Sequence, residues 1–428
     1  MTDDSSPATS PPSHSREPDD TRLLREVTLR SLLSFGPDAK PIVLERLNVL
    51  IGPNGSGKSN FIEAIALLRA ASGDLRDAVL KGGGVSEWIW KGSPAGLASV
   101  DAVVANPKGN QDLRHSLSFR AEGQRFRLED ERIENRDATG VWPPYDIRVA
   151  LYQGRPPEVS TAARQPSFYY RYQQGRPVVN VKGEERRLKQ GTVEPDASIL
   201  AQRRDPDQYP EITYLASAYS RFRVYREWSF GRDAPYREPQ KADMRNDRLE
   251  EGFSNLGLFL NRLRGKPRAK SALLAALRDL YDGITDFDVS IEGGTVQVFF
   301  TEGDFTIPAT RLSDGTLRYL CLLAILCDPE PPPLICLEEP ELGLHPDILP
   351  KLADLLISAS ERTQLIVTTH SDILVDAMTE QPETILVCEK QDGQTTMRRL
   401  DAAHLAHWLE KYRLGELWTR GELGGTRW

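Results

Sequence analysis

Long apolar segments are missing from this chain of 428 residues. No run approaches the roughly 18 to 20 apolar residues that a membrane-spanning helix needs, and the N-terminus lacks the basic and apolar regions of a secretory signal. We therefore expect no membrane contact and a cytoplasmic protein. Cysteine is scarce too. The four cysteines lie in apolar runs without a Cys-x-x-Cys pair, which argues against a disulfide framework or a zinc site: Cys321, Cys327, Cys336 and Cys388.

A strong excess of charge of one sign is also absent from most of the chain. The net charge is −8, and the first 21 residues carry five acidic side chains against Arg16 alone, so the remainder is nearly neutral. A basic field over the whole surface is excluded, although a local basic patch is not. The first segment is rich in Ser, Pro and Asp and nearly free of large apolar side chains, so residues 1–22 are predicted to form a disordered tail.

The stretch IGPNGSGKSN, residues 51–60, fits the pattern G-x-x-x-x-G-K-[ST]. It follows the apolar run LNVLIG and precedes SNFIEAIALLRA, so strand, loop and helix occur in the order that a phosphate-binding loop requires. Glycines there let backbone N–H groups point at phosphate oxygens, next to the positive end of the helix. Lys58 is expected to reach the β- and γ-phosphates, and the Ser59 hydroxyl to bind Mg²⁺.

Three further motifs follow in the second half of the chain. LSDGT, residues 312–316, opens an apolar helix, where Ser313 and Gly315 offer donors at a positive helix end; taken alone, Ser313 reads as an ordinary N-cap. LICLEEPELGLHP, residues 334–346, is an apolar strand that ends in Glu338 and Glu339. QLIVTTHSDIL is another such strand, followed by His370.

Parallel strands deliver their last residues to one edge of a sheet, where the phosphate loop also lies. We therefore expect Glu338 to hold Mg²⁺ through water, Glu339 to orient and polarise an attacking water, and His370 to bond the γ-phosphate or that water. Each motif also has a simpler interpretation by itself. A Glu-Glu pair before proline is commonly a solvated strand end, and a histidine after a strand is commonly a surface residue or a helix cap.

The series GPNGSGKSN, LSDGT, LICLEEPELGLHP and TTHSD resembles the ATP-binding heads of ABC-type ATPases, on the branch that includes RecF, SMC proteins and the overcoming-lysogenization-defect nucleases. It is most similar to bacterial "AAA family ATPase" proteins. These share an opening like SLLSFGP (31–37), a helix like FSNLGLFL (253–260) and an ending like YRLGELWTRGELGG (412–425). The resemblance covers residues 23–428, and its four motifs occur in the family's order.

The resemblance implies a role for each matched residue. The Walker A loop and the residue after it bind the nucleotide: Gly52, Pro53, Asn54, Gly55, Ser56, Gly57, Lys58, Ser59 and Asn60. Ser313 and Gly315 fall in the signature motif, which contacts the γ-phosphate held by a second subunit. Glu338 and Glu339 match the Walker B pair with Glu339 as catalytic base, and His370 matches the switch histidine. The implied cofactors are ATP and Mg²⁺, and the implied assembly is a homodimer that forms on ATP binding. Asp314 and Thr316 stand where the signature usually has Gly and Gln, which puts the turnover rate in doubt.

The expected fold is α/β, a P-loop NTPase head of ABC type with an antiparallel β subdomain and a helical insertion. Alternating runs predict the β meander at about 97–183, and helical periodicity marks the insertion. We divide the chain into the tail, a first ATPase lobe (23–189), the insertion (190–284), a second lobe (285–403) and a C-terminal segment (404–428).

Several functions remain open at this stage. An ABC transporter subunit is disfavoured because 254 positions separate Ser59 from Ser313, and a nuclease of the related kind because only 58 residues follow His370. The main prediction is a dimerising ATPase switch that acts on DNA or on an effector protein, in DNA metabolism or phage defence. The alternative is an ATP-sensing scaffold that does not hydrolyse ATP. Residues 221–248 carry eight basic and five acidic side chains interleaved with aromatics, which suits either nucleic-acid binding or a small core of their own.

Overall fold

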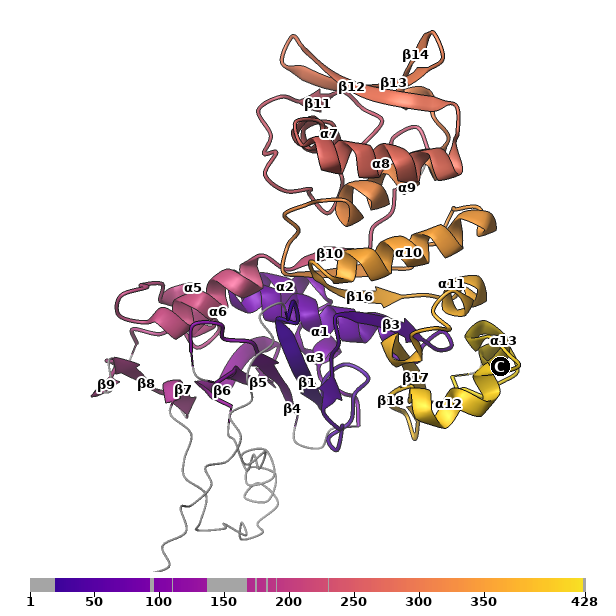
Figure 1. Ribbon diagram of the computed structural model, residues 1–428. Coiled ribbons are helices and arrows are strands. Elements are labelled where there is room, and N and C mark those ends of the chain that lie inside the picture. Colours follow the sequence, from indigo (N-terminus) through magenta and orange to yellow (C-terminus); the bar gives the residue numbers. More distant parts are fainter. Residues whose placement is uncertain are drawn as a thin grey trace, which may run out of the picture.

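The structure is a computed structural model that describes residues 20–92, 96–109, 111–136, 168–173, 175–181, 184–189, 191–229 and 231–425. Within these ranges the strands form three sheets, against which the helices pack (Figure 1). None of the helices described is both long enough and apolar enough to cross a bilayer.

A six-stranded sheet lies in the middle of the molecule. Its strands in spatial order are β10 (Arg223–Tyr225), β15 (Leu334–Glu338), β16 (Gln364–Thr368), β3 (Leu47–Ile51), β17 (Ile385–Gln391) and β18 (Gln394–Arg399). All neighbours pair in parallel except β18, which returns antiparallel beside β17. Both β3 and β16 are buried at every position, as central parallel strands covered on two faces should be.

Helices cover the two faces of this core sheet, and alternation along β3 shows which helices lie on which side. Val49 and Ile51 share an apolar cluster with α9 (Asp314–Leu326) and α10 (Leu349–Ser360). Leu50, which points the other way, belongs to the cluster of α1 (Lys58–Ala71). The core is therefore a three-layer α/β arrangement, with the phosphate loop between β3 and α1.

An eight-stranded antiparallel sheet packs against α1 outside these three layers. Its strands in order are β2 (Ile42–Val43), β1 (Leu24–Arg30), β4 (Leu97–Val104), β5 (Leu113–Glu122), β6 (Arg125–Asn135), β7 (Phe168–Gln173), β8 (Arg176–Val181) and β9 (Glu184–Arg187). The helices α2 (Leu75–Lys81), α3 (Val85–Trp88), α5 (Ile199–Gln202) and α6 (Pro210–Ser220) lie on this side of the molecule. This sheet is the expected antiparallel β subdomain, extended by the two strands that precede β3.

A small α+β unit stands above the core sheet in Figure 1. It consists of α7 (Leu256–Arg264), α8 (Pro267–Leu280) and a sheet of β11 (Gln240–Lys241), β12 (Ile284–Glu292), β13 (Thr295–Glu302) and β14 (Phe305–Pro308). The apolar faces of α7 and α8 pack on β12 and on α9. The unit thus packs on α9, the helix that begins in the signature motif LSDGT.

The structure distributes residues 190–284 differently from the single helical insertion that we expected. α5 and α6 pack beside α1, β10 is an edge strand of the core sheet, and only α7 and α8 belong to the upper unit. That unit also takes β12, β13 and β14, which we had assigned to the second lobe. The reason is that β10 has only three residues, all buried, within a segment whose many arginines hide its strand pattern.

The C-terminal part continues from β18 into α12 (Ala402–Leu409) and α13 (Leu414–Thr419). α13 packs on α11 (Asp372–Asp376), where the Asp376 carboxylate accepts the Gly415 backbone N–H at 2.6 Å. The start of the described chain is anchored as well. Asp20 pairs with Arg22 at 2.9 Å, so residues 20–22 are held in place although we expected the tail to reach 22. Residues 1–19 lie outside the described ranges.

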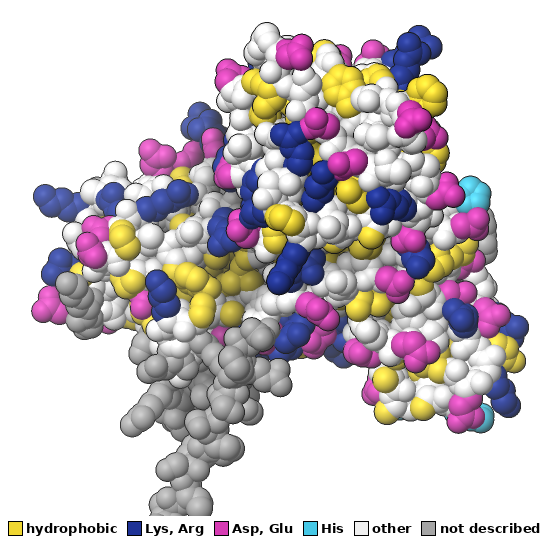
Figure 2. Space-filling model, turned by 45° about the horizontal axis from the view of Figure 1, so that its top comes forward, with side chains coloured by type: hydrophobic (Ala, Val, Ile, Leu, Met, Phe, Trp, Pro, Cys, Tyr) yellow, Lys and Arg dark blue, Asp and Glu magenta, His cyan; other side chains and the backbone are white. Residues whose placement is uncertain are grey.

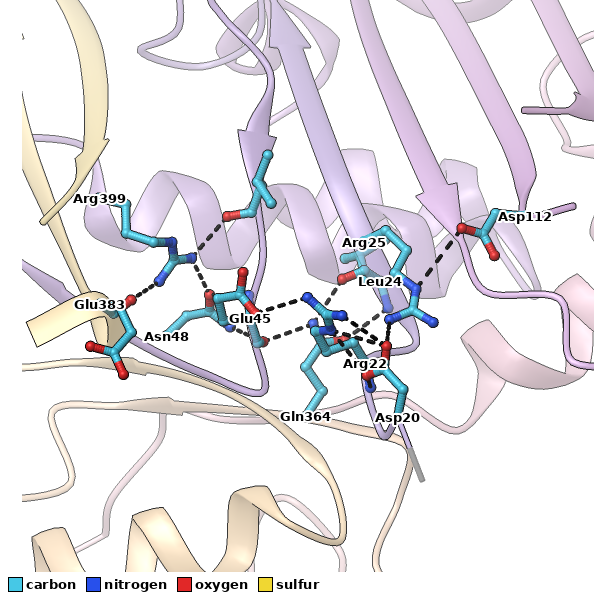
Figure 3. Close-up of polar contacts among 11 residues, drawn as sticks. Asp20, Arg22, Leu24, Arg25, Glu45, Asn48, Asp112, Gln364, Glu383 and Arg399 are labelled. Carbon is cyan, nitrogen blue, oxygen red and sulfur yellow. Dashed lines mark hydrogen bonds and ion pairs between the residues drawn. The ribbon is translucent and has the colours of Figure 1, made fainter. Parts of the chain in front are cut away.

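A polar network joins the strands at the amino edge of the core sheet, away from the phosphate loop (Figure 3). The Gln364 amide at the start of β16 exchanges hydrogen bonds with the Leu24 backbone, at 2.7 and 2.8 Å. Asn48 in β3 donates to Leu365 O at 3.0 Å and accepts from Arg399 at 2.6 Å. The network joins the two large sheets to one another. It therefore holds the core sheet in place at the end opposite its carboxyl edge, where the phosphate loop lies.

Candidate functional site

The carboxyl edge of the core sheet brings three predicted motifs together. The adjacent strands β3, β16 and β15 lead into the phosphate loop, His370 and Glu339 respectively. Backbone hydrogen bonds continue the pairing past the strand ends, from Thr369 N to Leu50 O and from Glu339 N to Thr368 O, both at 3.1 Å. Sequence order alone does not give this adjacency, because β16 lies between β3 and β15.

The phosphate loop adopts a conformation that its glycines permit. Gly52, Gly55 and Gly57 have φ angles of 147°, 76° and 104°, a region that other residues rarely adopt. A side chain at Gly52 would lie 2.2 Å from the Cys388 carbonyl oxygen, and one at Gly57 would lie 2.1 Å from Thr395 Oγ1. The loop is therefore packed against the β17–β18 hairpin on one side, and its backbone curves around the start of α1.

Side chains brace the loop from outside. The Thr395 hydroxyl of β18 lies 2.7 Å from Ser34 Oγ and 2.9 Å from the Ser56 carbonyl oxygen. The Asn60 amide on α1 donates to the same Ser34 Oγ at 2.7 Å. Ser34 belongs to the SLLSFGP stretch, so this stretch has a structural role beside the loop. Asn60 thus contacts the brace, while its predicted contact with nucleotide remains a prediction.

Lys58 lies across the loop. Its Nζ donates to the carbonyl oxygens of Gly52 at 2.8 Å and Pro53 at 3.1 Å, and the side chain is buried. Burial lowers the pKa of Lys58, while the charges of nearby groups, Glu338 and Glu339 among them, oppose the shift. The ammonium group therefore already sits among acceptors at the loop, where a phosphate would offer it a stronger partner.

The residues of the phosphate loop and the start of α1 fit a nucleoside triphosphate with Mg²⁺. The Ser56 hydroxyl is buried and has no hydrogen-bond partner in the described part of the chain. The N-terminus of α1 has no side-chain cap, so its first N–H groups are available to an anion, and Ser59 at that position is exposed. Asn54 and Gly55, at the tip of the loop, are exposed as well.

The two Walker B carboxylates differ in their surroundings. Glu338 ends β15, and its Oε2 lies 3.9 Å from Arg226 Nε. Glu339 follows in a left-handed conformation with φ of 47°, which is uncommon for a residue other than glycine. Its carboxylate turns toward His370, whose Nε2 lies 3.4 Å from Glu339 Oε1. The predicted base and the predicted switch histidine are thus neighbours.

Glu341 is a further acidic residue at this edge that sequence reasoning missed. Its Oε1 accepts hydrogen bonds from the Thr369 hydroxyl and from the His370 backbone N–H, both at 2.8 Å. Burial raises the pKa of Glu341. The carboxylate therefore fixes the backbone of His370, the predicted switch histidine. The only signal in the sequence was the third glutamate of EEPE, residues 338–341. Its position gave no indication that it contacts the residues that follow β16.

The signature residues lie elsewhere. Ser313 caps α9, where its Oγ accepts the Thr316 N–H at 3.1 Å, and a side chain at Gly315 would lie 3.0 Å from Gly343 O. These neighbours belong to α9 and to the turn after β15, and none to the phosphate loop. Figure 1 likewise draws α9 under α7 and α8, away from the start of α1. The structure thus does not bring Ser313 and Gly315 to the nucleotide loop of their own chain.

Arg237 holds the signature loop and was not foreseen. Its guanidinium donates to the carbonyl oxygens of Thr310 and Leu312, each at 2.8 Å, and to Asp314 Oδ1 at 2.6 Å. Asp314 also accepts the Gly231 N–H at 3.2 Å, and the hydrogen bond from Arg237 lowers the pKa of Asp314. The aspartate that replaces the usual glycine is thus an anchor for the loop. Arg237 is distant in sequence, and no local pattern could indicate it.

The basic, aromatic segment 221–248 mostly forms core. Phe222, Tyr225 and Tyr236 are buried, and Trp228 stacks on the buried Phe253 with ring centroids 5.4 Å apart. Phe230 lies outside the described residues. The aromatics that the structure describes in this segment are therefore packed inside the protein and not displayed for base stacking. Figure 2 shows acidic and basic side chains interleaved over the visible face, without a continuous basic stripe.

The ranges described contain no cluster of side chains of the kind that binds zinc. There, no group of three or more His, Cys, Asp or Glu side chains could hold a metal ion. The four cysteines are free thiols and buried. Burial raises the pKa of Cys327 to about 11 and that of Cys388 to about 12.

Comparisons with known proteins identify the family of this chain. Residues 47–376 match the family described as "AAA domain, putative AbiEii toxin, Type IV TA system". The chromosome partition protein Smc of Cereibacter sphaeroides is 30% identical over 161 residues, which are 37% of this chain and 13% of that protein. Smc of Desulfitobacterium hafniense is 34% identical over 91 residues, 20% of this chain and 7% of that protein. The matches thus span a small part of either relative.

Solved structures add the fold. An Smc head bound to the C-winged helix domain of ScpA aligns with a TM-score of 0.52 at 15% identity, over 90% of this chain and 99% of that one. An Smc head with an extended coiled coil, derived from Pyrococcus furiosus, gives 0.50 at 14% identity, over 91% and 99%. The predicted fold class, a P-loop ATPase head of ABC type, is confirmed. Because the AAA-domain model matches residues 47–376, more than half of the chain, the chain belongs to this family of AAA-domain ATPases.

Proposed function

We propose that the chain binds ATP with Mg²⁺ at residues 52–60 and hydrolyses it between two copies of itself. The observation that carries the proposal is the separation within one chain. Lys58, Glu339 and His370 lie at the loop, whereas Ser313 and Gly315 lie on α9. A second copy, facing the first, would bring its signature helix to the exposed tip of the loop.

Each residue at the edge has a chemical part in this proposal. ATP would supply the phosphoryl group that is transferred to water, and Mg²⁺ the neutralisation of its charge. The backbone N–H groups of the loop and Lys58 hold phosphate oxygens, while Ser59 and Glu338 hold the metal ion, Glu338 through water. Glu339 Oε1 accepts the proton of the attacking water, and His370, held by Glu341, keeps that carboxylate in place.

Closure of the dimer would follow from electrostatics. The N-terminus of α9 has partial positive charge, and the Ser313 hydroxyl and the Gly315 N–H lie at that end. A γ-phosphate on the facing copy would be neutralised by them in a dry interface. Hydrolysis would remove that group and release the copies. The ATP-bound dimer would then present a surface to DNA or to an effector protein.

The test is light scattering on Glu339→Gln, together with a turnover assay. The substitution keeps the shape of the side chain but removes the base, so we expect a stable dimer with ATP, monomers with ADP, and loss of hydrolysis. Glu361→Gln, at an exposed position beyond α10, is the matched control and should hydrolyse ATP like wild type. Ser313→Arg added to Glu339→Gln should block the dimer, because it puts a bulky side chain at the docking point.

Two results would contradict parts of the proposal. If the mass of Glu339→Gln were the same with ATP, with ADP and without nucleotide, the dimer mechanism would be wrong. If wild type dimerised with ATP but never turned over, the chain would be a sensing scaffold and not an ATP hydrolase. Asp314 and Thr316 in the signature make the turnover measurement necessary.

A further inference from the structure

A cavity of about 240 Å³ opens at the amino end of β10 and β15, beside the upper unit. Three arginines line it: Arg221, Arg223 and Arg248. Arg223 is the first residue of β10 and pairs in register with Ile335, whereas Glu338 ends the same β15 strand three positions further on. The cavity is therefore at the sheet edge opposite the phosphate loop and separate from the site described above.

The arginines in this cavity lack good anionic partners. Arg223 is 7% exposed, and its Nη1 donates to the backbone carbonyl oxygens of Ser220 and Phe222 at 3.1 and 2.5 Å. Within the described residues no carboxylate lies within ion-pair distance of Arg223 or of the exposed Arg221. Arg248 has only Glu250 at 3.9 Å, and its buried Nε has no hydrogen-bond partner in those residues.

The carboxylates that line the same cavity are, by contrast, already neutralised. Asp328 lies 3.6 Å from Arg262, and Glu330 pairs with Arg262 and Lys266 at 2.8 Å each. Asp247 pairs with Arg245 at 2.6 Å. None of these three cations lines the cavity. The acidic groups thus have their own partners. The positive charges of Arg221 and Arg223 are left over, and Arg248 has only the long contact to Glu250.

Burying the charge of Arg223 without a counter-ion is unfavourable. Burial lowers the pKa of Arg223 and the neighbouring charge of Arg248 lowers it further, while the charge of Glu251, which is itself paired with Arg69, opposes the shift. Guanidinium groups donate in a planar fork that matches the oxygens of a phosphate or carboxylate group. The volume is below the about 300 to 1,000 Å³ of pockets that hold drug-sized ligands, which favours a small ion.

We propose that this cavity, lined by Arg221, Arg223 and Arg248, is a binding site for a small oxyanion, a phosphate group or a carboxylate group. The site does not depend on ATP hydrolysis. DNA is a poorer fit, since the backbone of a rigid duplex reaches exposed Arg221 but not a side chain buried as deeply as Arg223. The ligand would bind where β10 meets the 247–249 segment and hold them together.

The experiment compares thermal unfolding in phosphate and in chloride at matched ionic strength. All proteins carry Lys58→Ala, which weakens phosphate binding at the nucleotide loop. We expect phosphate to raise the midpoint of Lys58→Ala and of Lys58→Ala/Arg232→Ala, the control with an exposed arginine outside the cavity. Lys58→Ala/Arg221→Ala should need about tenfold more phosphate for the same shift, because a charge-assisted hydrogen bond is lost. Arg248→Ala should act alike.

The outcomes separate the sources of the anion. A shift with malonate that Arg221→Ala also weakens would identify carboxylate ligands, and a shift with phosphate alone would identify phosphoryl ligands; either supports the site. An equal phosphate shift with and without Arg221 would overturn it, as would no shift in the Lys58→Ala protein. A shift with a short DNA duplex but with neither small ion would also overturn it, in favour of a DNA-binding face. Arg221 is exposed, so its replacement should not prevent folding.

Discussion

The contact between Arg237 and Asp314 gives the sharpest prediction about the signature loop. Arg237→Met keeps most of the apolar stem and removes the guanidinium, which donates to two carbonyl oxygens and to the carboxylate of Asp314. The Arg237 side chain is 13% exposed, whereas that of Asp314 is 38% exposed. The ion pair is therefore partly screened by water, and the backbone hydrogen bonds should account for most of the stabilisation.

The expected magnitudes follow from these contacts. Two hydrogen bonds from a charged donor to carbonyl oxygens, discounted for partial exposure, stabilise by about 1.5 kcal/mol. A screened ion pair adds about 0.5 kcal/mol. Arg237→Met should thus lower the free energy of unfolding by about 2 kcal/mol and Asp314→Asn by about 0.5 to 1 kcal/mol. The double variant should be less unstable than the sum of the two, with a coupling of about 0.5 kcal/mol or more.

Urea denaturation of the four proteins in this cycle measures the coupling directly. Arg232→Met, in the same segment and exposed, is the control and should leave stability within about 0.5 kcal/mol of wild type. Added to Glu339→Gln, Arg237→Met should also weaken the ATP-dependent dimer about tenfold, because closure would first have to order both signature loops. Single variants whose effects simply add, within about 0.3 kcal/mol, would show that Arg237 and Asp314 do not act as a pair.

Two other predictions concern the nucleotide edge. Lys58→Ala should weaken binding of a fluorescent ATP analogue by at least about tenfold, because the phosphates lose a charge-assisted donor, while the exposed Lys351→Ala should bind like wild type; equal affinities would overturn the loop assignment. Glu341→Gln should preserve the contact to His370 and remove a pH dependence of the protein's stability. The pKa of Glu341 in the folded protein is raised above its ordinary value of 4.5, so the protein loses stability as the pH rises through that raised pKa. The free energy of unfolding should thus decline between about pH 4 and 8, a range that covers the ordinary carboxyl pKa and values above it, in wild type but not in Glu341→Gln. Parallel curves for the two proteins would contradict this.

The features predicted correctly from the sequence are those that local pattern determines. The phosphate loop is specified by glycines at fixed spacing between a buried strand and an amphipathic helix. The strand ends before Glu339 and His370 are specified by apolar runs, and the rule that parallel strands finish at one edge then places them together. The observed contact between these two side chains, at 3.4 Å, depends on the left-handed conformation of Glu339, which no pattern indicated.

What the sequence did not reveal depends on contacts between distant segments. Arg237 meets Asp314 across 77 positions, and Thr395 meets the phosphate loop across 339. The extent of the insertion was misjudged for the same reason, because β10 becomes a strand only through pairing with β15, more than 100 residues later. Three buried residues among many charged ones carry too little periodicity to be recognised alone.

The turn after β15 connects the two halves of the proposed mechanism within one chain. Arg318 of α9 donates to Glu339 O at 2.8 Å, and its guanidinium lies 4.4 Å from the ring centre of Trp228, whose Nε1 donates to Glu338 O at 2.7 Å. Gly315, at the start of the same helix, packs on Gly343 O of that turn. The strained backbone of the Walker B end is therefore held by the helix that would serve the partner's nucleotide. In the proposed dimer, a shift of α9 at the interface would move Glu339 of the same chain through the buried Arg318. The two nucleotide sites would thus respond to one another through this one contact.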